Sequence, residues 1–168
     1  MPPNPFAGWD HALDIQPADL DDDGYQDLLI AYTRLDPWYV GRYIQVLINN
    51  QNGTFRDETD TRLPQSVNAD PYVYRLHLMD IDGDQDMDLI ARPWDGPDVN
   101  PLLFLNDGNG VFNWQPLDFG LWSLYYTFLD LDGGGGHDIV FATFAPPEDI
   151  YVIRDLGCAV FLPLVCRD

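Results

Sequence analysis

One acidic motif occurs three times along the chain and constrains the fold more than any other feature. It reads DLDDDGYQDLLIAY from Asp19, DIDGDQDMDLIAR from Asp80 and DLDGGGGHDIVFA from Asp130, at offsets of 61 (19 to 80) and 50 (80 to 130) residues. Repetition at such a period is typical of arrays in which each repeat is one supersecondary unit. We therefore expect a single region, 1–168, built from repeats at about 11–60, 70–118 and 121–157, with 158–168 as a divergent tail.

The residues that flank each motif predict strands. Before the motif every second residue is apolar, as in Leu13, Ile15 and Pro17, which is the period of a strand with one buried face. After it comes a continuous apolar run, 28–31, 89–91 or 139–142, which is typical of a strand buried on both faces. Helical periodicity is absent, so the sequence predicts β-structure throughout.

A second shared pattern completes the repeat. The segment LINNQNGTF, 47–55, matches FLNDGNGVF, 104–112, and Asn-Gly between apolar segments is a strong hairpin signal. Each unit is therefore a four-stranded antiparallel meander of the size of a propeller blade, and the fold class is all-β. In the third repeat the turn and last strand give way to CAVFLPLVCRD.

The charge of the chain excludes several partners. Acidic residues number 28 against eight Lys and Arg, for a formal net charge of −20. Nucleic acid and anionic membranes are therefore poor partners, because both need a cationic surface. No apolar run approaches the roughly 20 residues of a spanning helix, and the first residues do not resemble a secretion signal.

The acidic loops predict Ca²⁺ sites. Alternate Asp residues at positions 1, 3, 5 and 9 can direct carboxylate oxygens at one centre, Gly24 at position 6 permits the bend, and position 7 can add its carbonyl. Six to eight hard oxygen ligands suit Ca²⁺ better than Mg²⁺. An EF-hand is excluded because its twelfth position is Glu, whereas Ile30, Ala91 and Phe141 stand there. Acidic surface turns without metal are the alternative.

The three loops do not offer equal ligand sets. The first two keep all four carboxylates, although Gln85 replaces the Gly of the bend, and in the third Gly134 replaces the carboxylate at position 5. We expect two good sites and one weaker site. The predicted ligands are Asp19, Asp21, Asp23, Tyr25 and Asp27; Asp80, Asp82, Asp84, Asp86 and Asp88; and Asp130, Asp132, Gly136 and Asp138.

The pattern D-x-D-x-D-G-x-x-D, followed by an apolar strand and residues like LLNDGNGTF, resembles the FG-GAP/VCBS repeats of integrin-α-type β-propellers. The resemblance covers residues 11–157, and Phe119-Gly120 is its Phe-Gly landmark. It implies a propeller with Ca²⁺ in the loops between first and second strands, a location outside the cell or in the periplasm, and a role in adhesion or ligand binding. In that family the propeller is sometimes a module of a larger enzyme or lectin.

Three blades do not close a propeller, for which four to eight are typical. The chain is then a fragment of a longer protein, one of several copies that complete a ring, or an open arc with exposed ends. Cys158 and Cys166 either form a disulfide or are buried thiols.

The loops between second and third strands are candidates for ligand binding. In an up-and-down meander they lie at the opposite end from the acidic loops, and the first two contain Arg34 with Trp38 and Arg92 with Trp94. Trp beside Arg can stack on a sugar ring or anchor a protein partner. The alternative is that both indoles pack between blades as structural plugs.

Catalysis has little support in the sequence. Ser66 and Ser123 lie outside nucleophile motifs, there is no Lys, and the three His residues stand at unlike positions of different repeats. We therefore expect a non-enzymatic recognition module. An accessory part of a polysaccharide-active enzyme, a lectin and a degenerate fragment are the alternatives.

Overall fold

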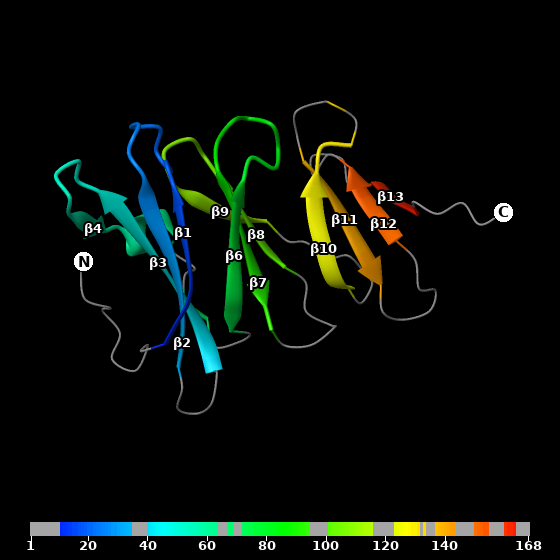
Figure 1. Ribbon diagram of the computed structural model, residues 1–168, viewed down its shortest axis with the longest axis horizontal. Coiled ribbons are helices and arrows are strands. Elements are labelled where there is room, and N and C mark those ends of the chain that lie inside the picture. The colour runs from blue at the N-terminus through cyan, green and yellow to red at the C-terminus, as the bar shows by residue number, and fades with distance from the viewer. Residues whose placement is uncertain are drawn as a thin grey trace. The chain divides into compact units, whose positions relative to one another are not determined.

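The computed structural model describes residues 11–34, 40–63, 67–68, 72–94, 101–115, 123–131, 133, 137–143, 150–154 and 160–163. These residues form β-strands and one helical turn (Figure 1). The elements are β1 (His11–Ala18), β2 (Asp27–Arg34), β3 (Val40–Asn49), β4 (Phe55–Asp57), α1 (Thr59–Arg62), β5 (Val67–Asn68), β6 (Val73–Met79), β7 (Asp88–Pro93), β8 (Leu102–Asn106), β9 (Phe112–Gln115), β10 (Ser123–Leu129), β11 (Asp138–Thr143), β12 (Ile150–Arg154) and β13 (Val160–Pro163).

The strands form three antiparallel sheets with the predicted up-and-down order. They are β1-β2-β3-β4, with the short β5 added to β3, then β6-β7-β8-β9, and then β10-β11-β12-β13. The all-β, four-stranded antiparallel repeat is thus confirmed, and each sheet has the form of a propeller blade. Val160–Pro163, in the tail that has no strand assigned from the sequence, pairs with β12 as the fourth strand of the third sheet.

The chain divides into two compact units. The first contains the sheets β1–β5 and β6–β9, and the second contains β10–β13 together with the loop Asp80–Gln85. In the first unit the two sheets share one hydrophobic core, to which both sheets contribute apolar residues from alternate positions of their inner strands. Its members are Ala18, Leu20, Leu29, Ala31, Ile44, Val46, Ile48, Leu63, Val73, Leu76, Leu89, Ala91, Phe104 and Phe112.

The first strand of each sheet carries a register shift at the same place. It falls between Ala12 and Asp14 in β1, between Val73 and Arg75 in β6, and between Ser123 and Tyr125 in β10. A shift of this kind changes which side chains face the core.

The predicted buried face of β1 is wrong. Ile15 is 51% exposed, whereas Asp14 is half-buried and accepts a hydrogen bond from the Leu76 backbone N–H of β6 at 2.8 Å. The strand next to the neighbouring sheet therefore directs a polar side chain at it.

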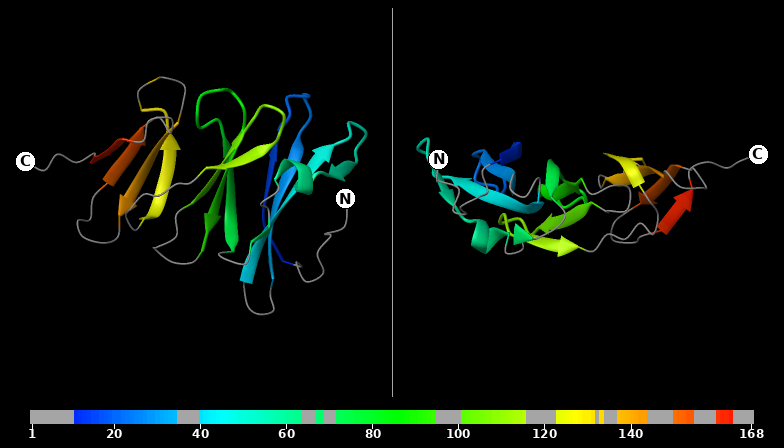
Figure 2. Two further views of the ribbon diagram at one scale, coloured as in Figure 1. Left: turned by 180° about the vertical axis from the view of Figure 1, so that it is seen from behind. Right: turned by 90° about the horizontal axis from the view of Figure 1, so that it is seen from below.

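Two further features complete the fold. The helical turn α1, which the sequence does not predict, follows β4 and is seen beside β9 in the two views of Figure 2. Among the described residues no helix is long and apolar enough to cross a membrane.

Candidate metal-binding loops

The first Asp of each motif organises the loop that follows it. The two carboxylate oxygens of Asp19 accept the N–H groups of Asp23 and Gly24, at 3.1 and 2.8 Å. Asp80 accepts those of Gly83 and Gln85, at 2.7 and 3.0 Å. The carboxylate of Asp130 accepts the Gly133 N–H at 2.6 Å. Position 1 therefore has a structural role in all three loops, whatever else it binds.

The first two loops adopt the same backbone conformation despite different sequences. Position 6 has a φ of +85° at Gly24 and +80° at Gln85, so the non-glycine residue makes the bend that its place in the motif predicts. Position 4 is also left-handed, with φ of +55° at Asp22 and +83° at Gly83. Residues other than glycine rarely adopt such backbone angles without an energetic cost, so the loop imposes the left-handed conformation on Gln85.

Three carboxylates of the first loop converge. Asp19, Asp21 and Asp23 each place an oxygen within 4.8 Å of the other two. Asp21 Oδ2 accepts a hydrogen bond from Arg62 Nη2 at 2.8 Å, whereas Asp21 Oδ1 is buried and has no hydrogen-bond donor. A buried carboxylate oxygen without a donor is costly unless a cation meets it.

Asp23 lies at the exposed side of this group. It accepts hydrogen bonds from Gln51 Nε2 at 3.0 Å and from the Tyr25 N–H at 2.9 Å, and these two bonds, in that order, lower the pKa of the Asp23 carboxyl. The contact with Gln51 confirms that the acidic loop and the β3–β4 turn share one end of the sheet (Figure 1). Tyr25 is 45% exposed.

Asp27, at position 9, is not part of this three-residue group. Its side chain is fully buried, and its oxygens accept the N–H groups of Leu20 at 3.1 Å and of Asn49 at 2.7 Å. Burial raises the pKa of the Asp27 carboxyl, while these two hydrogen bonds oppose the shift. Asp27 therefore joins the start of the loop to the end of β3, a role that the sequence does not predict.

In the second loop the structure brings together Asp80, Asp82 and Asp88, each with an oxygen within 4.8 Å of the other two. Asp88 is fully buried and accepts the Asn106 N–H at 2.8 Å, as Asp27 does with Asn49 in the first sheet. Burial, followed by the charge of Asp84, raises the pKa of the Asp82 carboxyl. Asp84 and Asp86 lie outside the group of three.

The third loop is described only in part. Asp130 is exposed, and Asp138 is buried and accepts the Leu131 N–H at 2.9 Å, so position 9 accepts a backbone N–H in all three repeats. Asp132 and Gly136 lie outside the described residues.

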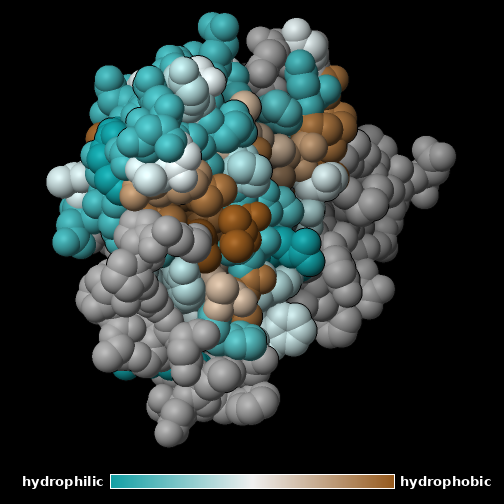
Figure 3. Space-filling model, turned by 60° about the vertical axis from the view of Figure 1, so that its left-hand side comes forward, coloured by the Kyte–Doolittle hydropathy of each residue, from teal (hydrophilic) through white to brown (hydrophobic). Residues whose placement is uncertain are grey.

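The donor sets of the first two loops fit a hard divalent cation. Each supplies three converging carboxylates, and in the first loop one buried oxygen still lacks a partner. Ca²⁺ prefers oxygen ligands and accepts irregular geometry and added waters, so it fits better than Mg²⁺. Hydrophilic side chains gather at the loop end of the first unit (Figure 3).

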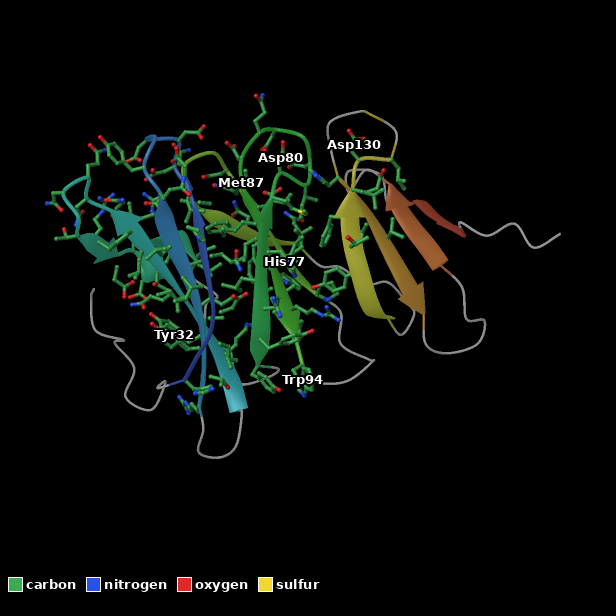
Figure 4. All side chains as sticks on the ribbon, viewed as in Figure 1. Tyr32, His77, Asp80, Met87, Trp94 and Asp130 are labelled. Carbon is green, nitrogen blue, oxygen red and sulfur yellow. The ribbon has the colours of Figure 1, made fainter. Side chains whose placement is uncertain are left out.

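The described candidate recognition residues lie at the other end of their sheets. Trp94 is 61% exposed, and it lies at the end of β7 opposite to Met87 of the acidic loop (Figure 4). Its ring meets the Tyr74 ring edge-on, with 5.2 Å between centroids, and the Arg92 guanidinium lies 5.4 Å from the Tyr74 centroid. Arg34 is exposed, and Trp38 lies outside the described residues.

Two residues at the loop end are missed by sequence reasoning. Arg62 reaches the acidic loop from α1, and Asn106 Nδ2 of the second sheet donates to the Leu20 carbonyl at 3.0 Å. The only local signal for Arg62 is its spacing of four residues from Glu58, with which it pairs at 2.6 Å.

A family model described as FG-GAP-like repeat matches residues 19–91. No curated protein and no solved structure matches the chain. The matched segment begins at the first residue of the first acidic loop, includes the second loop and ends within β7. Residues 19–91 therefore match FG-GAP-like repeat sequence, which is consistent with the FG-GAP/VCBS type of repeat, and the four-stranded antiparallel sheets are consistent with blades of a β-propeller-type module.

Proposed function

We propose that this chain is a Ca²⁺-binding β-propeller-type module that recognises a protein or carbohydrate partner outside the cell or in the periplasm. The observation that carries the metal part is the first loop, where three carboxylates converge and Asp21 Oδ1 is buried without a donor. The family match over residues 19–91 supports it, because such repeats often hold Ca²⁺ in these loops. In this proposal the aspartates are metal ligands and not catalytic acids.

Bound Ca²⁺ has a clear physical role in a chain of this charge. Three ions would change the formal charge from −20 to −14, and each would neutralise carboxylates that otherwise repel one another across a few ångströms. Because the acidic loops join the first two strands of each sheet, their closure stabilises the sheets.

A thermal melt tests the metal proposal. We expect a higher midpoint in Ca²⁺ than in chelator, with Mg²⁺ giving a smaller shift, because the loops offer more oxygen ligands than Mg²⁺ takes from protein. Asp21→Ala should remove more of the Ca²⁺-dependent shift than Asp132→Ala, since the third loop has fewer carboxylates. A midpoint that ignores Ca²⁺, together with no heat of binding by calorimetry, would contradict the proposal.

The recognition part rests on Trp94, Tyr74 and Arg92. An exposed indole whose edge is packed on a second ring is held in place, so little side-chain freedom is lost when a partner stacks on it. Trp, Tyr and Arg are also the residues most enriched in binding hot spots. The 61% exposure of Trp94 argues against its role as a plug between blades.

Matched tryptophan variants test this surface. Trp114 on β9 is 48% exposed, so Trp114→Ala is the control for Trp94→Ala. Against a panel of soluble oligosaccharides, we expect Trp94→Ala alone to abolish binding if the partner is a glycan. Binding of a protein partner and not of any glycan, again lost only in Trp94→Ala, would select the adhesion role. Equal loss in both variants, or turnover of a polysaccharide, would contradict the proposal.

A further inference from the structure

We propose that Arg62 is a positioning residue that couples the first acidic loop to the contact between the two sheets of the first unit. This inference rests on the proposed Ca²⁺ binding and assigns to it a residue outside the acidic motif. Arg62 belongs to α1, which follows β4, yet it bonds both the acidic loop and the β8–β9 turn of the second sheet.

The guanidinium of Arg62 is shared between three partners. Nε donates to Glu58 Oε2 at 2.6 Å, Nη2 donates to Asp21 Oδ2 at 2.8 Å, and Nη1 donates to the backbone carbonyl of Asn109. The side chain of Arg62 is only 11% exposed, so most of its surface is sheltered from solvent. Glu58 accepts the hydrogen bond from Nε, which leaves Nη2 for Asp21 and Nη1 for Asn109.

The contact with Asp21 fixes the direction of its free oxygen. Because Oδ2 accepts a hydrogen bond from Arg62, rotation of the carboxylate is restricted, and Oδ1 is kept in its buried position. The Asp21 side chain is thereby held where it converges with Asp19 and Asp23. A partner that orients a metal-ligating side chain in this way raises affinity without touching the metal.

Nη1 of Arg62 occupies space beside the β8–β9 turn of the second sheet. Asn109 and Gly110 form the β8–β9 turn, and a Cβ at Gly110 would collide with Nη1 of Arg62. Gly110 is buried, and its φ is +76°. The same turn is tied to the acidic loop a second time, through Asn106 Nδ2 and the Leu20 carbonyl.

These contacts make a continuous path from Asp21 through Arg62 to the β8–β9 turn. If an ion in the first loop holds Asp21 in place, it also holds Arg62 against the turn. By thermodynamic linkage, packing of the turn against Arg62 must then favour binding of the ion by the same free energy. The structure offers Arg56 as a comparison, because it also pairs with Glu58 but hydrogen-bonds Asn50 in the neighbouring β3–β4 turn.

Hydrogen exchange read by mass spectrometry, as a function of Ca²⁺, tests this coupling in the full chain. In the wild type we expect peptides covering 19–27 and the turn 106–111 to become protected at the same Ca²⁺ concentration. In Arg62→Gln the midpoint for 19–27 should rise by about tenfold, the lower end of the cost of losing an outer-shell partner. The turn should no longer follow the loop, while the midpoint for 80–88 and the whole Arg56→Gln profile should stay unchanged.

The possible outcomes separate this inference from the proposal on which it rests. Absence of Ca²⁺-dependent protection in the wild type would defeat the proposed metal binding itself. If 19–27 is protected normally and the Ca²⁺ midpoint for its protection does not change in Arg62→Gln, the role of Arg62 is overturned. A midpoint that moves to lower Ca²⁺ would also overturn it, because Arg62 would then compete with the ion. Should Arg62→Gln not fold, Arg62→Lys keeps the charge and loses the fork, and the same shift is expected.

Discussion

Asp27 belongs to a candidate metal-binding motif, yet its side chain acts through hydrogen bonds. It stands at position 9 of the acidic loop, but its two oxygens accept backbone N–H groups from Leu20 and Asn49. Asp88 and Asp138 take a backbone N–H in the same way. The ninth position is therefore the one at which the motif is built into the sheet.

The substitution Asp27→Ala tests this role. It leaves two backbone N–H groups without acceptors, each at a cost of about 1–3 kcal/mol, so we expect the free energy of unfolding to fall by about 2–6 kcal/mol. Chemical denaturation should show this loss in chelator as well as in Ca²⁺. A loss confined to Ca²⁺-containing buffer would show that Asp27 acts only as a metal ligand.

The acidic loops and Asn-Gly turns are the elements that carry the repeat, and their backbone angles are more alike than their residues. Gln51 and Gly53 of the first turn have φ of +61° and +81°, and Gly108 and Gly110 of the second have +80° and +76°. The acidic loops behave in the same way, with Gln85 at the angle of Gly24. The places where a non-glycine residue adopts a left-handed angle are the strained ones.

Relief of that strain gives a stabilising substitution. In Gln85→Gly the left-handed backbone angle is no longer strained, so we expect the free energy of unfolding to rise by about 1 kcal/mol. The left-handed conformation costs a non-glycine residue roughly 1–2 kcal/mol, and the greater freedom of glycine in the unfolded chain offsets part of this gain. Equilibrium denaturation measures the change. Gln26→Gly, in the first loop at an angle that favours no glycine, is the control and should destabilise.

The turn that follows β4 has a pH dependence of its own. Burial alone would raise the pKa of Glu58, but hydrogen bonds from Arg56 and Arg62 outweigh it and hold the pKa below its ordinary value of 4.5. Ionised Glu58 therefore stabilises the fold above the unfolded-state pKa, and this contribution is lost as the pH falls through the lower folded-state value.

Comparison with Glu58→Gln isolates this effect from the many other carboxylates. We expect the wild type to be more stable at neutral pH, and the gap between the two proteins to narrow as the pH falls below 4.5. A gap that stays constant through this range would mean that the ion pairs of Glu58 do not contribute.

The whole protein has a formal net charge of −20, and 13 of its 28 acidic residues lie in the three acidic motifs. Self-repulsion of this size destabilises a compact state, and it acts most strongly where like charges are closest. Salt and Ca²⁺ oppose it in different ways, because salt screens charges over a distance whereas an ion in the loop meets the oxygens directly.

Melting at two salt concentrations separates these contributions. Raising NaCl from about 0.1 M to about 1 M shortens the screening length from about 10 Å to about 3 Å. The midpoint in chelator should therefore rise more with salt than the midpoint in Ca²⁺, where the loops are already neutralised. An equal rise in both conditions would show that the repulsion is spread over the surface and is not concentrated in the loops.

The local parts of this fold follow from sequence alone. The repeat, the antiparallel four-stranded sheets, the shared turn conformations and the bend at Gln85 are all predicted, because alternation of apolar residues, Asn-Gly pairs and crowded carboxylates act over a few neighbouring residues. The acidic loops as candidate metal sites follow in the same way.

Contacts between residues far apart in the sequence required the tertiary structure. Asp14 with Leu76, Arg62 with Asp21 and Asn106 with Leu20 join residues 62, 41 and 86 positions apart. In β1 it is Asp14, and not Ile15, that meets the next sheet, and Gly110 leaves space for Nη1 of Arg62 at the β8–β9 turn. No local pattern encodes such pairs, since they depend on which faces meet once the strands have twisted and packed.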